Sequence, residues 1–148
     1  MIVPSFPLTG DPGEWSDLVL IAATVFLEAE GESEPGQAAV AHVIANRMEQ
    51  GSASPAQVIL GPDSRAWHDD RAYEPWSCWN DDYQSRALAR LASASDAGAA
   101  RAWKAAAVGY WRLTPDPSLG AWFYLNVPLT RKLRGGTLPG WFSEQKVT

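Results

Sequence analysis

Residues 14–30 read EWSDLVLIAATVFLEAE, and this stretch decides the fold. Apolar side chains recur in it at three- and four-residue spacing, in Trp15, Leu18, Ala22, Val25, Phe26 and Ala29. That spacing puts them on one face of a helix. We therefore expect a helix over 14–30 that turns one apolar stripe toward a core and stops at Gly31.

Four more helices are expected downstream of this one. They cover 34–50, 55–60, 82–94 and 97–113. Their caps are Ser33, Ser54 (in a capping box with Gln57), Asp81 or Asp82, and Asp96. Pro115 and Pro117 end the last helix. Residues 1–13 are expected to form an irregular arm, and a short β-hairpin is expected around Ala121 to Asn126. The pattern predicts one mainly α (α+β) domain over 1–148.

Composition limits the class of protein. The chain has 148 residues, of which 46% are hydrophobic and 20% charged, which is typical of one globular domain with a core. No run reaches the roughly 18 apolar residues of a membrane span, and no basic residue precedes the first apolar ones as in a signal peptide. A net charge of −5 argues against nucleic acid as a partner. We expect a monomer without membrane insertion.

The sequence gives little support for a nucleophilic site or a metal site. Cys78 is the only cysteine, which excludes an intrachain disulfide, and a nucleophilic cysteine would need His42 or His68 as its base. His42 lies among alanines and valines, which favours a structural role. The adjacent residues 68–70, His-Asp-Asp, do not face one point and are interpreted as a solvated loop. We expect no metal and no cofactor.

Tryptophans and acids point to a different chemistry. Eight tryptophans suit a cleft that stacks sugar rings, although a core could also use them. Residues 61–80 are rich in aromatics without a usable period, which favours a functional loop. Glu28, three residues after Val25, lies near the apolar stripe in the last turn of its helix. Burial and the negative helix end would both raise the pKa of that carboxyl, as a general acid requires. Glu30 is expected to be solvated, and a wholly solvated acidic face is the alternative.

Three stretches resemble the spore-cortex-lytic cell wall hydrolases of the SleB/CwlJ type. The first is residues 26–47, FLEAEGESEPGQAAVAHVIANR, which is similar to the family signature Glu-Ala-x-Gly-Glu, Gly-Gln-x-Ala-Val-Ala and Asn-Arg. The second is SCWN at 77–80, and the third is DPSLGAWFYLN at 116–126. The first motif is long and specific, and the other two support it.

The resemblance implies a compact domain related to lysozymes and lytic transglycosylases. It implies cleavage of the β-1,4 bond between N-acetylmuramic acid and N-acetylglucosamine in peptidoglycan. Glu28 would be the catalytic acid and Glu32 its partner. Trp79, Tyr124 and Asn126 would line the glycan cleft.

The reaction type stays open at this point. Hydrolysis needs a second carboxylate, for which the chain offers Glu32, Asp81, Asp82 and Asp116. Asp116 lies between two prolines, where capping a turn is the expected role. Lytic transglycosylation needs only Glu28 and is favoured, with a lysozyme-type muramidase or a non-catalytic glycan-binding module as alternatives.

The resemblance also indicates where such an enzyme would act. With no signal peptide and no wall-binding domain expected, a phage endolysin fits best. It would be made in the host cytoplasm and reach the periplasm and cell wall through a holin pore. A bacterial wall-remodelling enzyme is the alternative.

Overall fold

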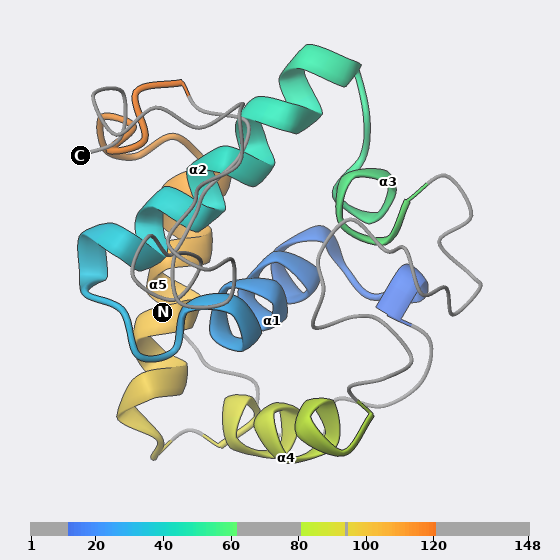
Figure 1. Ribbon diagram of the computed structural model, residues 1–148, viewed down its shortest axis with the longest axis vertical. Coiled ribbons are helices and arrows are strands. Elements are labelled where there is room, and N and C mark those ends of the chain that lie inside the picture. Colours follow the sequence, from blue (N-terminus) through green and yellow to red (C-terminus); the bar gives the residue numbers. More distant parts are fainter. Residues whose placement is uncertain (1–11, 62–80, 94, 121–148) are drawn as a thin grey trace, which may run out of the picture.

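The computed structural model describes residues 12–61, 81–93 and 95–120 (Figure 1). A 3-10 turn, η1 (Pro12–Glu14), precedes five α-helices. These are α1 (Asp17–Ala29), α2 (Glu34–Gly51), α3 (Pro55–Leu60), α4 (Asp81–Leu91) and α5 (Ala97–Tyr110). The described residues contain no strand, so the expectation of a mainly helical protein is confirmed. The hairpin expected at 121–126 lies outside the described residues.

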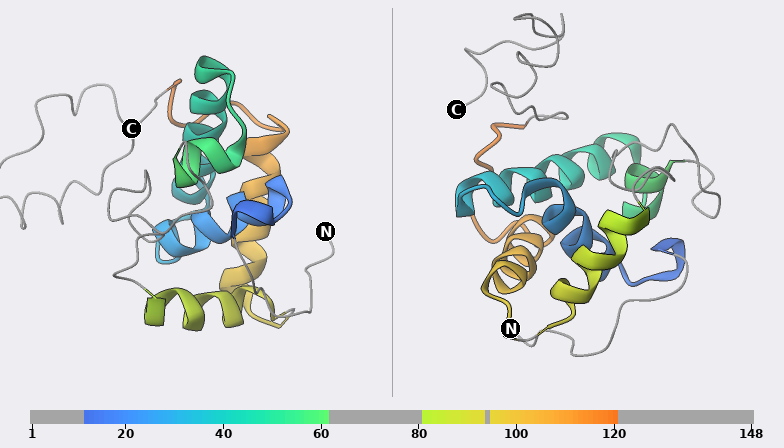
Figure 2. Two further views of the ribbon diagram at one scale, coloured as in Figure 1. Left: turned by 90° about the vertical axis from the view of Figure 1, so that its right-hand side faces the viewer. Right: turned by 60° about the horizontal axis from the view of Figure 1, so that its bottom comes forward.

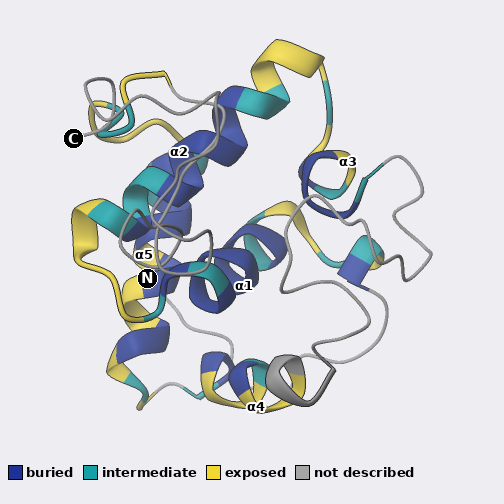
Figure 3. Cartoon of the chain, in the orientation of Figure 1, coloured by how far each residue is buried: buried dark blue, intermediate teal, exposed yellow. Residues whose placement is uncertain are grey.

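Helix α1 is the centre of the fold. Every residue from 20 to 27 is buried, and this part of the helix is dark blue in Figure 3. The expectation of a single apolar stripe is therefore wrong. A helix that is apolar all round must be covered all round, and α1 contacts α2, α3, α4 and α5. Its one polar member in this stretch, Thr24, donates its hydroxyl to the Leu20 carbonyl at 2.8 Å.

Helices α2 and α5 cross closely on one side of α1. Gly109 makes the approach possible, because a Cβ there would come within 2.4 Å of the Ala41 Cβ and 2.8 Å of the Ala41 carbonyl carbon. Helix α4 lies across α1 from α2 (Figures 1 and 2). Its Ala87 and Leu91 are buried, and the Leu91 carbonyl accepts the indole N–H of Trp103 in α5 at 3.2 Å. Together with α3, these helices enclose α1.

The predicted caps are largely present. Ser33 and Asp96 accept the N–H groups of Gly36 and Ala99, and Ser54 and Gln57 form the capping box. At the start of α4 the prediction is wrong, because Asp81 and Asp82 lie inside its first turn instead of before it. Helix α1 starts at 17 instead of 14, because residue 14 and the last two residues of the expected irregular arm form the separate turn η1.

Helix α5 ends at Tyr110, three residues earlier than predicted. Arg112 has a φ of 53°, which takes the chain out of the helix. The N–H of Leu113 then donates to the Val108 carbonyl at 3.0 Å and that of Arg112 to the Gly109 carbonyl at 3.3 Å. This is a Schellman ending, which usually uses glycine at the left-handed position. The prolines that follow come after the helix has already closed.

Candidate functional site

Glu28 lies in the last turn of α1, at the edge of the core. It is half-buried, whereas Leu27 and Ala29 on either side of it are buried. Residues three, four and seven positions earlier share its helix face, and these are Val25, Thr24 and Ile21, all buried. The Glu28 carboxyl therefore extends a buried face to its rim, where a group can be partly desolvated and still meet a ligand.

Glu32 lies in the turn that follows α1 and is exposed. Its backbone N–H donates to the Ala29 carbonyl at 3.0 Å, so the chain has left the α-helix by this point. Gly36 allows the turn to approach α2, because a Cβ there would lie 3.1 Å from the Glu32 Cβ. Glu28 and Glu32 thus belong to one structural unit, the end of α1 and the turn after it.

Gln37 of α2 holds that unit in place. Its side chain is buried, and its Nε2 donates to the carbonyls of Ala29, Glu30 and Glu32 at 3.1, 3.3 and 3.4 Å. The last carbonyls of a helix have no partner within the helix, and here one amide from the neighbouring helix supplies it. The sequence contained the signal, since Gln37 follows Gly36 in the family-like motif, but the motif did not reveal this role.

Glu30 is anchored, so the expectation that it is solvated is wrong. It forms an ion pair with Arg90 of α4. The same guanidinium donates to Asp96, the cap of α5, at 2.9 Å and lies 5.2 Å from the centre of the Phe26 ring. Hydrogen bonds from Arg90 and then from the Ala99 N–H lower the pKa of Asp96. The pair ties the end of α1 to α4 and α5.

A second polar cluster joins α2 to the segment after α5. The Asp116 carboxylate accepts from the N–H and hydroxyl of Ser118 at 2.7 and 2.6 Å, and from Asn46 Nδ2 and the Gly120 N–H at 2.9 Å each. Arg112 donates to Asn46 Oδ1 at 2.7 Å and to Glu49 Oε2 at 2.9 Å. The Asn-Arg end of the first family-like stretch and the Asp-Pro start of the third therefore meet, although 70 residues separate them.

The bonding of Asp116 decides its role. Burial by itself would raise the pKa of this carboxyl, but the hydrogen bonds from Ser118, Asn46 and two backbone N–H groups together lower it to about 2. Its four acceptor positions are all used by the fold. Such a carboxylate is a poor base and a poor nucleophile, because either reaction would break these bonds. The expectation that Asp116 caps a turn is confirmed.

His42 is fully buried, and neither ring nitrogen has a hydrogen-bond partner in the part of the chain that the structure describes. Burial, the largest effect, lowers its pKa; the charge of Asp116 opposes this and that of Arg112 adds to it. The ring is therefore held neutral within the core, in agreement with the structural role expected from its alanine and valine neighbours.

Several predicted site residues fall outside the described part of the chain. These are Trp79, Tyr124 and Asn126, together with Cys78 and His68. Within the described ranges, no group of three His, Cys, Asp or Glu side chains is placed to hold a metal ion. None of the helices described is both long and apolar enough to cross a membrane. Comparison with protein families, with curated proteins and with solved structures finds no match to this chain.

Proposed function

We propose that this protein cleaves the β-1,4 bond between N-acetylmuramic acid and N-acetylglucosamine in peptidoglycan, as a lytic transglycosylase with Glu28 as general acid and base. The observation that carries the proposal is the placement of Glu28, half-buried in the last turn of the buried helix α1. A general acid has to be reached by its substrate, and a carboxyl at the rim of the core meets that requirement while being partly shielded from water.

Two further contacts support the resemblance on which the substrate class rests. The glutamine of the family-like motif braces the turn that carries Glu32. The asparagine of that motif binds the aspartate of the third stretch. The positions that the motifs share are thus positions that touch in this fold, as expected if the stretches build one site in a lysozyme-like domain.

The reaction needs only one carboxyl group. Glu28 donates its proton to the glycosidic oxygen as the C1–O4 bond breaks. As a carboxylate it then takes the proton from the 6-hydroxyl of the same muramic acid, and O6 forms a bond to C1. The products are a free 4-hydroxyl and a 1,6-anhydro ring, with no water consumed. Glu28 ends the cycle protonated, as it began.

Two of the described acids are already engaged by the fold, which favours this course over hydrolysis; the side chains of Asp81 and Asp82 lie outside the description. A hydrolase needs a second carboxylate as a base or nucleophile. Asp116 is saturated with hydrogen bonds and Glu30 is ion-paired. Glu32 is exposed in the turn beside Glu28, and this position keeps a lysozyme-type muramidase as the second candidate.

Replacing Glu28 with glutamine tests the assignment. Glu28→Gln keeps the shape but removes the proton, so clearing of isolated cell walls should slow by about 10²- to 10⁴-fold. Glu30→Gln, two residues away, is the matched control and should keep most of its activity per folded molecule. More than about a tenth of wild-type activity in Glu28→Gln would rule Glu28 out as the acid.

Mass spectrometry of the soluble fragments separates the candidates. Lytic transglycosylation gives 1,6-anhydro-muramic ends. Reducing muramic ends, one water heavier, would identify a muramidase, and Glu32→Gln should then abolish activity. Walls that bind the protein without releasing fragments would identify a glycan-binding module. If the protein is an endolysin, its expression should lyse host cells only when a holin is co-expressed.

A further inference from the structure

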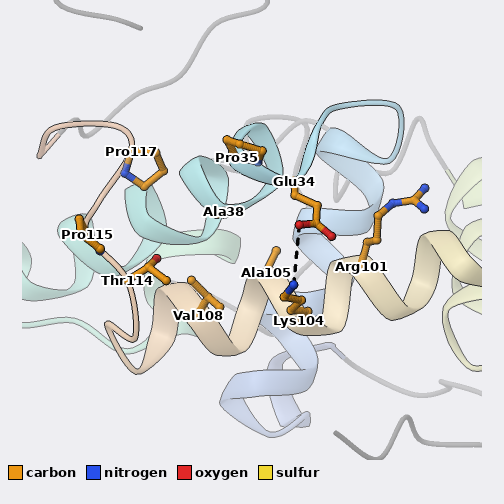
Figure 4. A pocket seen from close by; sticks show the side chains of 10 residues that line it. All are labelled: Glu34, Pro35, Ala38, Arg101, Lys104, Ala105, Val108, Thr114, Pro115 and Pro117. Carbon is orange, nitrogen blue, oxygen red and sulfur yellow. Dashed lines mark ion pairs between the residues drawn. The ribbon is translucent and has the colours of Figure 1, made fainter.

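A pocket of about 300 Å³ lies between α2 and α5, beside the turn that carries Glu32 (Figure 4). It begins two residues after Glu32, at Glu34 in the first turn of α2. This volume is at the lower end of the range of small-molecule sites. No residue of the pocket belongs to the catalytic machinery proposed above.

The walls and the ends of the pocket differ in chemistry. Small apolar side chains from both helices line its middle: Pro35, Ala38, Ala105 and Val108. Figure 4 shows Thr114, Pro115 and Pro117 at one end and the charged side chains at the other. The apolar part accommodates methyl-sized groups of a ligand. The side chains at the charged end determine which charge the neighbouring ligand group should carry.

The charged end carries an excess of positive charge. Lys104 pairs with Glu34 at 3.7 Å, and both side chains are more than half exposed. Arg101, one turn before Lys104 on the same face of α5, has no ion-pair partner among the described residues. Two cations and one anion give this end a net charge of +1 on a chain whose net charge is −5. A ligand carboxylate would find its complement at Arg101.

The length of the pocket limits the ligand further. Its lining on α5 runs from Arg101 to Val108, which is roughly 10 Å at the rise of an α-helix. An extended peptide advances about 3.3–3.6 Å per residue, so about three residues fit.

We infer that this pocket binds the short peptide stem attached to the muramic acid of peptidoglycan, with alanine methyl groups against Pro35 and Ala38 and a stem carboxylate at Arg101. The inference rests on the proposed function, because that function supplies the substrate. The stem combines methyl groups with free carboxylates over a few residues, which matches the walls, the charge and the length of the pocket.

Direct binding tests the inference without requiring cleavage. The probe is the tripeptide N-acetyl-L-Ala-γ-D-Glu-L-Lys, titrated into the ¹⁵N-labelled protein and followed by NMR. Arg101→Gln should weaken binding about 2- to 5-fold, the range of an exposed ion pair. Ala38→Phe, which fills the pocket, should weaken it at least tenfold, and Arg86→Gln on α4 is the matched control that leaves it unchanged. Circular dichroism confirms that each variant is folded.

Two results would overturn the inference, one from this titration and one from analytical ultracentrifugation. One is equal binding of the same tripeptide with its carboxylates amidated. The other is a concentration-dependent increase in sedimentation coefficient that Ala38→Phe removes, which would show that the pocket receives a second copy of the chain.

Cleavage assays keep this inference distinct from the proposed function. Walls stripped of peptide stems by an amidase are compared with intact walls. If the stem binds in the pocket, Arg101→Gln slows cleavage of intact walls and not of stripped ones. If wild type cleaves neither substrate but binds the tripeptide, the proposed function fails and the pocket assignment stands. If it cleaves both and the pocket variants change nothing, the pocket assignment fails alone.

Discussion

The ends of helices α1 and α5 close in different ways. At the end of α1, Glu30 keeps right-handed geometry with a φ of −52°, and the free carbonyls are bonded by Gln37 of another helix. At the end of α5, Arg112 turns left-handed and the backbone bonds to its own last turn. One end depends on how two helices dock, and the other is formed by consecutive residues. Glu28 and its neighbouring acids lie at the end of α1, which another helix holds in place. Their placement therefore depends on tertiary structure.

The largest effect should come from the contact between α5 and α2, the helix that also bonds the end of α1. Gly109→Ala forces the α2 and α5 backbones apart, because the new Cβ would meet Ala41 at 2.4 Å. Overpacking of this kind costs about 3 kcal/mol of the free energy of unfolding. Gly51→Ala is the control, since its Cβ would meet nothing closer than 3.7 Å. Urea denaturation measures both, and equal stability of the two variants would show that the helices do not cross at Gly109.

Gln37→Leu should affect the end of α1 and leave the end of α5 unchanged. It removes the amide from three carbonyls, and we expect a loss of about 2 kcal/mol in the free energy of unfolding. Cell-wall clearing should fall as well, because the turn after Glu28 loses its brace. Gln57→Leu, which removes an amide used only in a local capping box, should cost under about 1 kcal/mol. If the two variants lose equal stability, the hydrogen bonds from Gln37 to the end of α1 contribute no more to stability than a local capping box does.

Asp116→Asn should act on the segment after α5 and make it less sensitive to acid. The folded pKa of about 2 lies below the ordinary 3.8, so the stabilisation from ionised Asp116 is complete above pH 3.8 and is lost as pH falls toward 2. We expect the variant to lose roughly 1–2 kcal/mol at pH 7. Urea midpoints from pH 7 to pH 2 should then fall less steeply than those of the wild type; parallel curves would contradict this.

The smallest effect is expected at His42. His42→Leu removes two buried nitrogens that have no partner among the described residues, so stability at pH 7 should stay the same or rise by up to about 1 kcal/mol. Because burial lowers the pKa of His42, the unfolded chain takes up a proton first as pH falls below 6.5, and the wild type loses stability there. The variant should lack this loss between pH 6.5 and 5. A clear drop in thermal midpoint at pH 7 would instead indicate a hidden partner for the ring.

Local sequence rules predicted the helices and most of their caps. Ser33, Ser54 and Asp96 each lie just before a helix and accept the N–H of the residue three positions later, so neighbouring residues contain all the information. The same rules missed the early end of α5, because a left-handed Arg112 is uncommon and no glycine marks it.

Glu28 could be selected from the sequence because its distance from the apolar stripe and from the end of its helix is a local property. What only the tertiary structure decided is which candidate acids the fold itself engages: Glu30 is paired with Arg90, and Asp116 is bonded by Asn46 and its own turn. It also decided that α1 is buried on every side and that a pocket opens between α2 and α5. The physical reason is that helix periodicity depends on neighbours along the chain, whereas ion pairs, braces and pockets depend on residues up to 70 positions apart that meet only when the helices pack.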